Sequence, residues 1–167
     1  MLAGTTVSTQ MVDPGEPVPY MDRTRQYYRA LDYTTDYVWA RHDEVPFATL
    51  PKPLSDCRLA LITTAGPAPH DGKRQLWSGT IDPAPAKLHT ANLAWDKEST
   101  HTDDRGSFLP IEVASKLARD GVFAGLAPRF HGVPTEYSQR STTDDVAPKV
   151  LQRLRDDGAD AAILCPL

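Results

Sequence analysis

Two continuous apolar runs, each bounded by turn-forming residues, predict the central strands of the fold. The first run covers residues 58–64 and ends at Gly66 and Pro67, and the second covers residues 159–165 and follows Gly158. A strand that is apolar at nearly every position is typical of a parallel sheet, in which both faces are buried. We therefore predict two central, buried strands.

Apolar side chains that recur every three or four residues predict three amphipathic helices. The first helix follows Pro19 and covers residues 20–31. The second covers residues 110–121, with a proline in its first turn and a glycine at its end. The third begins near Thr143 and ends at Gly158. Because helices that join parallel strands form crossover connections, we predict a parallel or mixed open α/β sheet.

Fifteen prolines divide the rest of the chain into short segments. Residues 1–16 are small and polar and are predicted to be a disordered tail, which leaves residues 17–167 as a single α/β domain. The other expectations are an extended segment at 45–53, a surface loop at 67–86, a strand at 87–95 and a short strand or turn at 122–127.

The composition is that of a folded domain, with 40% hydrophobic and 24% charged residues. The 18 basic and 22 acidic residues leave a net charge of −4, which argues against a nucleic-acid partner. No apolar run approaches the roughly 20 residues that a membrane helix needs, and the N-terminus lacks a signal-peptide pattern. We therefore expect a cytoplasmic protein without a membrane partner, and a homo-oligomer stays open.

Neither the cysteines nor the acidic and histidine residues follow a metal-binding pattern. Cys57 and Cys165 form no CxxC pair, and the polar run from His89 to Asp104 matches no known ligand spacing. If the two predicted strands are parallel, the cysteines lie at opposite ends, on the order of 20 Å apart at about 3.3 Å per residue. We therefore expect no metal and no disulfide.

Ligands of open α/β sheets bind at the carboxyl ends of the strands. Thr63, Thr64 and Gly66 close the first predicted strand, where hydroxyl groups and backbone N–H groups could bind an anion. An ordinary turn after a strand explains the same residues equally well. Cys165 is the one thiol at the carboxyl end of a predicted strand, so it is a candidate catalytic residue, with a buried structural thiol as the alternative.

The segment at residues 127–132 (APRFHG) is expected to be a turn that presents Arg129 and His131 at the same sheet edge. His131 could act as an acid/base or as the partner of a thiolate, and Arg129 could bind a carboxylate with two hydrogen bonds. The alternative is a loop histidine beside a surface ion pair. We predict that His131 and Cys165 share one open crevice with residues 63–66.

Four segments, taken together, resemble a known family. They are residues 19–28 (PYMDRTRQYY), 46–65 (PFATLPKPLSDCRLALITTA), 127–132 (APRFHG) and 156–166 (DDGADAAILCP). The set resembles the N-terminal half of the selenoprotein B family of glycine, sarcosine, betaine and D-proline reductases. The resemblance extends from about residue 17 to the end of the chain.

The resemblance implies part of a reductase subunit whose selenolate or thiolate acts on a substrate held by a pyruvoyl-type partner subunit, with a dithiol/disulfide couple. In that family the last strand leads into a selenocysteine or cysteine, which is expected just after Leu167. The chain itself would then hold no cofactor, form an incomplete domain and be inactive alone.

Two explanations fit this end point, a UGA codon that encodes selenocysteine or a gene that has lost its second half. The alternative function is a non-catalytic α/β subunit or binding module that pairs with another chain. The DNA after the Leu167 codon distinguishes them, because an in-frame UGA followed by Pro and Cys codons supports the reductase.

Overall fold

The computed structural model describes residues 17, 19–36, 38–45, 48–94 and 96–167. It divides the chain into two units, Met1–Val45 and Pro46–Leu167, each of which is described by itself. The predicted tail at residues 1–16 lies outside the described residues. None of the helices in the described ranges is both long and apolar enough to cross a membrane.

The first unit contains α1 (Tyr20–Ala30), which confirms the helix predicted after Pro19. Its surface is held by local charge contacts. Arg29 Nε donates to Asp36 Oδ1 at 2.9 Å, and the guanidinium of Arg25 lies 4.9 Å from the centre of the Trp39 ring. No residue of α1 is buried, so the helix is amphipathic without a core of its own.

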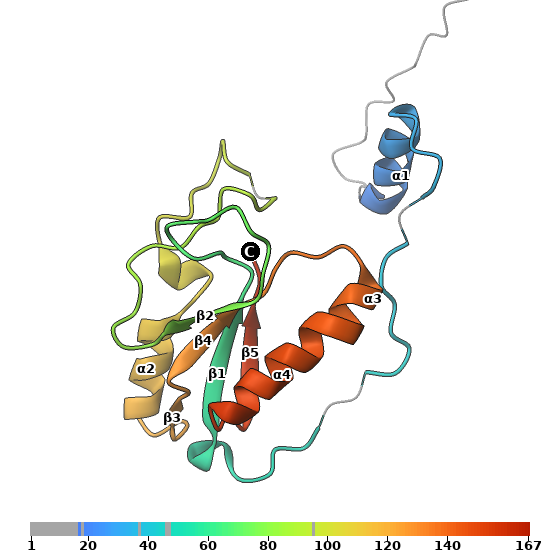
Figure 1. Ribbon diagram of the computed structural model, residues 1–167. Helices are drawn as coiled ribbons and strands as arrows, with labels where there is room; N and C mark the ends of the chain where they lie inside the picture. Colours follow the sequence, from blue (N-terminus) through green and yellow to red (C-terminus); the bar gives the residue numbers. More distant parts are fainter. Residues whose placement is uncertain (1–16, 18, 37, 46–47, 95) are drawn as a thin grey trace, which may run out of the picture. The chain divides into compact units, whose positions relative to one another are not determined.

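The second unit is built on a mixed, open five-stranded sheet (Figure 1). Its strands are β1 (Arg58–Thr63), β2 (Trp77–Thr80), β3 (Gly125–Leu126), β4 (Arg129–Gly132) and β5 (Ala161–Cys165). β1 pairs in parallel with β3, β4 and β5, and β2 pairs antiparallel with β4. The predicted α/β class is therefore confirmed.

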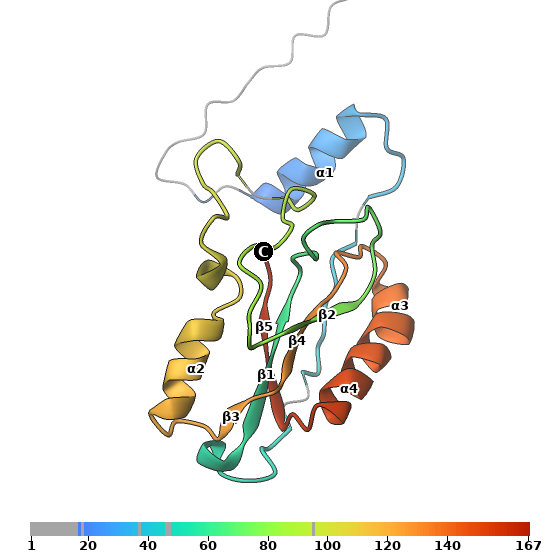
Figure 2. The same cartoon turned by 60° about the vertical axis from the view of Figure 1, so that its left-hand side comes forward.

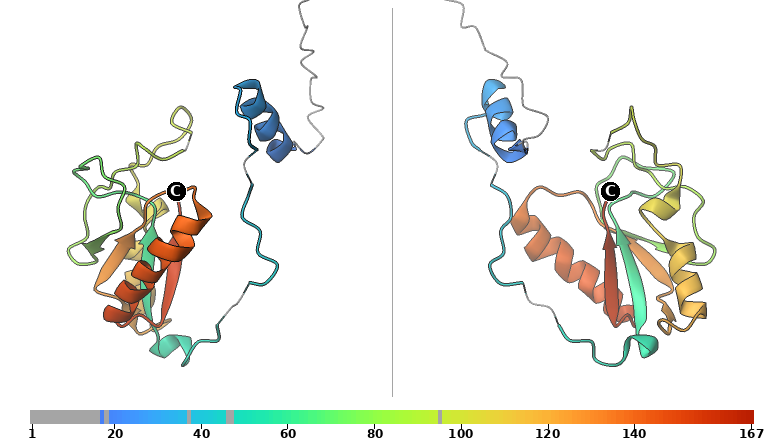
Figure 3. Two further views of the ribbon diagram at one scale, coloured as in Figure 1. Left: turned by 45° about the vertical axis from the view of Figure 1, so that its right-hand side comes forward. Right: turned by 180° about the vertical axis from the view of Figure 1, so that it is seen from behind.

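Helices cover both faces of this sheet (Figures 2 and 3). α2 (Ile111–Arg119) lies on one face, and a longer helix lies on the other. The longer helix consists of α3 (Gln139–Ser141), a π-helical segment (Thr142–Val146) and α4 (Ala147–Asp156). Short 3₁₀ turns at Leu54–Asp56 and Arg105–Ser107 precede β1 and α2. We refer to the two sides of the sheet as the α2 face and the α4 face.

The apolar core lies on the α2 face. Leu59 and Leu61, two positions apart on β1, both point to this face and pack with Phe130 of β4. Phe108, Leu109, Ile111, Ala114 and Phe123 complete the buried cluster. Leu61, Leu109 and Phe130 are each fully buried, so the face that carries the core is well covered.

Gly132 is a strand residue and not the turn residue that the sequence suggested. It pairs with Trp77 of β2, whose indole Nε1 donates to Ala65 O at 3.0 Å and whose ring meets Phe130 edge-on at 5.2 Å. A Cβ atom at Gly132 would overlap the Trp77 indole. The glycine is therefore needed because an aromatic ring occupies the place of its side chain.

The prediction that β5 is a central, buried strand is wrong. Of the described strands, only β1 pairs with β5. The exposed fraction is 43% for Ile163 and 72% for Leu164, so an apolar sequence lies at an open edge. A continuous apolar pattern predicts burial on both faces of a strand, but it does not show whether a strand lies along each edge. Here one edge of β5 has no partner among the described strands.

Four further expectations need correction. The predicted loop at 67–86 contains β2, whose Trp-Ser-Gly-Thr sequence lacks apolar alternation because Gly79 lies under the Phe130 ring. The predicted strand at 87–95 is reduced to one bridge, in which His89 pairs with Gly66. The predicted turn at 127–132 contains β4. The third helix begins earlier than expected, because the Ser138 side chain accepts a hydrogen bond from Ser141 N.

The helix predicted at residues 110–121 is confirmed as α2, and of the short strand or turn expected at 122–127, Gly125 and Leu126 form β3. Both cysteines are free thiols, as predicted. Residues 46 and 47 of the predicted extended segment lie outside the described residues, and residues 48–53 contain no helix or strand.

We predict that Gly132→Ala lowers the free energy of unfolding by about 1–3 kcal/mol, since the added methyl group must displace the Trp77 indole. Gly125→Ala is the matched control, because a Cβ atom there meets nothing within 4 Å. Urea unfolding followed by circular dichroism and tryptophan emission measures both. Equal stability of the two variants would show that the indole does not require the glycine.

Candidate functional site

The carboxyl end of β1 is joined to the carboxyl end of β5 by a threonine. Thr64 Oγ1 accepts a hydrogen bond from Leu167 N at 3.0 Å and lies 3.3 Å from Leu167 O. Thr63 is 1% exposed, and its hydroxyl donates to Phe108 O and accepts from Ala65 N, both at 3.3 Å. Thr63 therefore closes the strand internally and leaves Thr64 at the surface of the edge.

A cavity of about 80 Å³ lies at this carboxyl edge, where the sequence predicts a crevice. Thr64 and Gly66 line it from the end of β1, and residues 133–135 line it from the end of β4. Because β1 and β4 are parallel, both strands deliver their following loops to the same edge. The loop before β2 contributes residues 70 and 73–75, and the segment after β2 contributes residues 89, 92 and 93.

Two stacked imidazole rings form the polar part of this cavity. The rings of His70 and His89 lie 4.1 Å apart with an interplanar angle of 16°. Asn92 Nδ2 lies 3.3 Å from His70 Nε2, and the His89 backbone pairs with Gly66 through hydrogen bonds of 2.8 and 2.9 Å. The sheet edge therefore fixes one imidazole, and stacking places the other against it.

The charge of the cavity wall is positive. Lys73 and Arg74 are among the sixteen lining residues, none of which is an aspartate or glutamate. The nearest acidic group in sequence is Asp71, whose carboxylate lies 3.8 Å from Lys73 Nζ. The cavity therefore suits a neutral or anionic ligand.

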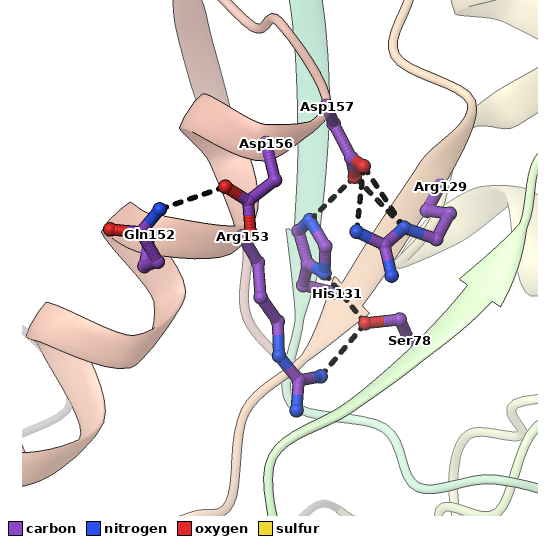
Figure 4. A network of polar contacts seen from close by, with 7 residues as sticks. All are labelled: Ser78, Arg129, His131, Gln152, Arg153, Asp156 and Asp157. Carbon is purple, nitrogen blue, oxygen red and sulfur yellow. Dashed lines mark hydrogen bonds and ion pairs between the residues drawn. The ribbon is translucent and has the colours of Figure 1, made fainter.

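A second polar cluster lies between the sheet and α4 (Figure 4). Asp157, with 5% of its side chain exposed, accepts hydrogen bonds from Arg129 Nε at 3.0 Å and Arg129 Nη2 at 2.7 Å. His131 Nε2 lies 3.2 Å from the other carboxylate oxygen. On its far side, His131 Nδ1 contacts Ser78 Oγ at 2.9 Å, and Arg153 Nη1 donates to the same oxygen at 2.8 Å.

This cluster favours a neutral His131. Burial lowers the pKa of His131, and the Asp157 carboxylate opposes this effect in part. His131 Nε2 faces the Asp157 carboxylate, and Nδ1 accepts from the Ser78 hydroxyl, whose oxygen accepts from Arg153. Hydrogen bonds from Arg129 to Asp157 also raise the pKa of Arg129. One chain of polar contacts thus connects β2 and β4 to the C-terminal end of α4.

Ser78, His131 and Asp157 follow the order of a hydrolytic triad, but their surroundings differ from one. His131 is 0% exposed, and the Ser78 oxygen is already engaged by Arg153. The cavity at the carboxyl edge is lined by neither Ser78 nor His131. A nucleophile and its base must reach the substrate, so this geometry instead joins α4 to the sheet.

The prediction that Arg129, His131 and Cys165 meet in one crevice is wrong. β1 lies between β4 and β5, with Ile62 opposite His131 and Thr63 opposite Cys165. Successive side chains of a strand point to opposite faces, so His131 lies on the α4 face and Cys165 on the α2 face. Substrate binding by Arg129 and catalysis by His131 stay predictions, and both side chains have partners within the fold.

Cys165 has few features of a reactive thiol. Burial raises the pKa of Cys165, which disfavours the thiolate, and its sulfur contacts Ile163 O at 3.9 Å. Cys57 is fully buried and its sulfur contacts the Lys52 and Pro53 carbonyls. A catalytic role for Cys165 stays a prediction that these surroundings do not favour.

Sequence reasoning missed the residues that give both polar regions their partners. Asp157 precedes the glycine that ends α4, and its position in the acidic pair was the one signal available. Ser78 and His70 lie in a segment interpreted as a loop. Within the described ranges, no group of three or more His, Cys, Asp or Glu side chains could hold a metal ion.

We predict that the free energy of unfolding falls as the pH decreases below about 6.5, the ordinary value for histidine. Folded His131, with its lowered pKa, stays neutral where the unfolded chain binds a proton, so acid favours the unfolded state. Asp157→Asn should cost about 1–3 kcal/mol near neutral pH, because charged hydrogen bonds are lost. In this variant the loss of stability with falling pH should also continue to lower pH, because without the carboxylate the pKa of folded His131 is lowered further.

Asp156→Asn is the matched control, because Asp156 is exposed and its carboxylate accepts only from the Gln152 side chain, at 2.8 Å, among the contacts drawn in Figure 4. Urea unfolding between about pH 5 and about pH 8 measures both variants. Identical pH profiles for Asp157→Asn and Asp156→Asn would contradict the assignment of this cluster.

Comparison with known proteins gives one informative match. No family model matches the sequence, and no solved structure matches the chain. Among curated proteins, the glycine reductase complex component B subunit gamma of Symbiobacterium thermophilum is 28% identical over 145 residues, which cover 79% of this chain and 33% of that protein. The chain spans about a third of the length of this relative. The match agrees with the resemblance carried by the four sequence segments, because this relative is a B-component subunit of a glycine reductase complex.

Proposed function

We propose that the chain is part of a subunit of a reductase complex of the glycine, sarcosine, betaine or D-proline reductase type. The observation that carries this proposal is the 28% identity over 79% of the chain to a component of the glycine reductase complex. In this role the chain supplies an α/β domain whose carboxyl sheet edge faces the substrate.

The geometry of the sheet edge supports this role. The cavity at the ends of β1 and β4 is small, positively charged and free of acidic lining residues. A carboxylate is the group that amino acid and betaine substrates have in common, and such a wall attracts it. The region also lies where open α/β sheets bind their ligands.

The redox chemistry is assigned to groups outside this chain. Reductive cleavage needs a dithiol that gives up two electrons as it is oxidised to a disulfide. Cys57 and Cys165 are free thiols at opposite ends of the paired strands β1 and β5. Cys57 precedes β1, whereas Cys165 lies opposite Thr63 at the carboxyl end. They cannot form that couple with each other. We therefore propose that the chain binds and positions substrate, and that a partner or a further segment supplies the selenol or thiol.

A non-catalytic module that pairs with another chain is the second candidate. The observation that favours it is the open edge of β5, where the Leu164 side chain is 72% exposed. Unpaired apolar strand edges are templates for pairing with another chain. The two candidates differ in whether the carboxyl-edge cavity affects the activity of the assembled complex.

We predict that the purified chain alone has no dithiol-dependent activity on glycine, sarcosine, betaine or D-proline. Purification of the tagged chain from its source cells should instead recover a pyruvoyl-containing subunit, identified by mass spectrometry, and the recovered complex should cleave one of these substrates with dithiothreitol as reductant. Turnover by the chain alone would overturn the assignment of redox chemistry to other groups. Recovery of the chain without any reductase subunit or activity would overturn the proposed function.

A further inference from the structure

Among the residues that the structure describes, four buried polar side-chain atoms have no hydrogen-bond partner, and three of them belong to residues that line the same cavity; the fourth, His131 Nε2, faces Asp157 at 3.2 Å. The three at the cavity are His70 Nδ1, His89 Nε2 and Thr135 Oγ1. Buried polar groups in folded proteins almost always have a partner, and those without one call for an explanation such as a bound molecule. Their concentration around one cavity indicates that it is built to hold a polar ligand.

The hydrogen-bond pattern identifies one of these atoms as a donor and allows a second to be one. The Asn92 amide nitrogen can only donate, so His70 Nε2, which lies 3.3 Å away, accepts. In the neutral imidazole the hydrogen is then on Nδ1, the atom without a partner. The Thr135 hydroxyl can also donate. The ligand must therefore offer acceptor oxygens.

Charge and size narrow the ligand further. Lys73 and Arg74 are cationic residues of the lining, and the nearby carboxylate of Asp71, 3.8 Å from Lys73 Nζ, does not line the cavity. A volume of about 80 Å³ exceeds the space of one water, roughly 10–15 Å³ on the same measure, yet it suits only a molecule of a few heavy atoms. Leu93 and Val133 add apolar walls beside the donors. A carboxylate on a short carbon chain meets all three conditions.

We propose that this cavity binds the carboxylate of a small amino acid or N-methylated amino acid. His70 Nδ1–H and the Thr135 hydroxyl donate to the carboxylate oxygens, and His89 Nε2 provides a third polar contact. Lys73 and Arg74 attract the anion. The identity of the ligand as an amino acid rests on the proposed function. The site itself rests on the unpartnered atoms.

Gly66 provides the sharpest test of the site. An added Cβ atom would lie 3.5 Å from His70 Nδ1 and 3.6 Å from His89 Cβ, which is ordinary contact, and Gly66 has no positive φ that a side chain would strain. Gly66→Ala should therefore fold and place a methyl group against the unpartnered nitrogen. Gly125→Ala is the matched control, because its Cβ atom would meet nothing within 4 Å. Thr135→Val is a second variant, which removes one donor with little change of shape.

The full chain, labelled with ¹⁵N at its histidines, is titrated with glycine, sarcosine, acetate, methylamine and inorganic phosphate at constant ionic strength. We expect the His70 and His89 ring signals to shift and saturate with the three carboxylates and not with methylamine. Gly66→Ala and Thr135→Val should each weaken glycine binding about tenfold, as expected for one lost charge-assisted hydrogen bond, whereas Gly125→Ala should leave it unchanged.

The outcomes separate the site from the function. Absence of ring shifts with carboxylates, equal shifts with methylamine, tighter binding of phosphate or unchanged affinity in both cavity variants would each overturn the carboxylate site. Carboxylate binding without any association with a reductase complex would leave the site standing and remove the proposed function. An active complex in which carboxylates do not shift the His70 and His89 ring signals would overturn the carboxylate site and leave the proposed function standing.

Discussion

The hydrogen-bonded register of β1 is the constraint on which the rest of the second unit depends. β1 pairs on one side with β3 and β4 and on the other with β5. Because all three pairings are parallel, the loops that follow β1, β4 and β5 reach one edge of the sheet, and this edge holds the cavity. The same register determines that Leu61 and Phe130 face the core while His131 faces α4.

The two faces of the sheet are held by different physical interactions. The α2 face buries a continuous apolar cluster that includes Leu61, Phe130 and Ile111. The α4 face instead carries the chain of polar contacts from Arg153 through Ser78 and His131 to Asp157, and Val150 is the one buried residue within α4 itself. The polar side chains on the α4 face therefore contact one another, whereas polar atoms beside the carboxyl-edge cavity have no hydrogen-bond partner among the described residues.

The sequence predicted those elements whose signal is local. β1 and α2 follow from apolar periodicity and from flanking glycines and prolines, and the crevice at Thr64 and Gly66 follows from the general placement of ligands in α/β sheets. β2 was not predicted because its glycine is explained only by packing. Gly79 lies under the Phe130 ring, which is about 50 residues further along the chain. His131 was assigned to a turn because its partners are distant, with Ser78 53 positions away. His70 and Thr135 lie in loops without periodicity, so no pattern could bring them together.

The polar attachment of α4 has a consequence for how the domain opens. α4 buries only Val150 among its own side chains, and its separation would also uncover Ala60 and Ile62 of β1, so the change in heat capacity should be smaller than that for opening the core on the α2 face. The free energy of that opening is set by a few charged hydrogen bonds and not by the core, which stays packed on the opposite face. We expect such a segment to open as a unit below the global unfolding transition, so that its amides exchange with solvent while those of β1 remain protected.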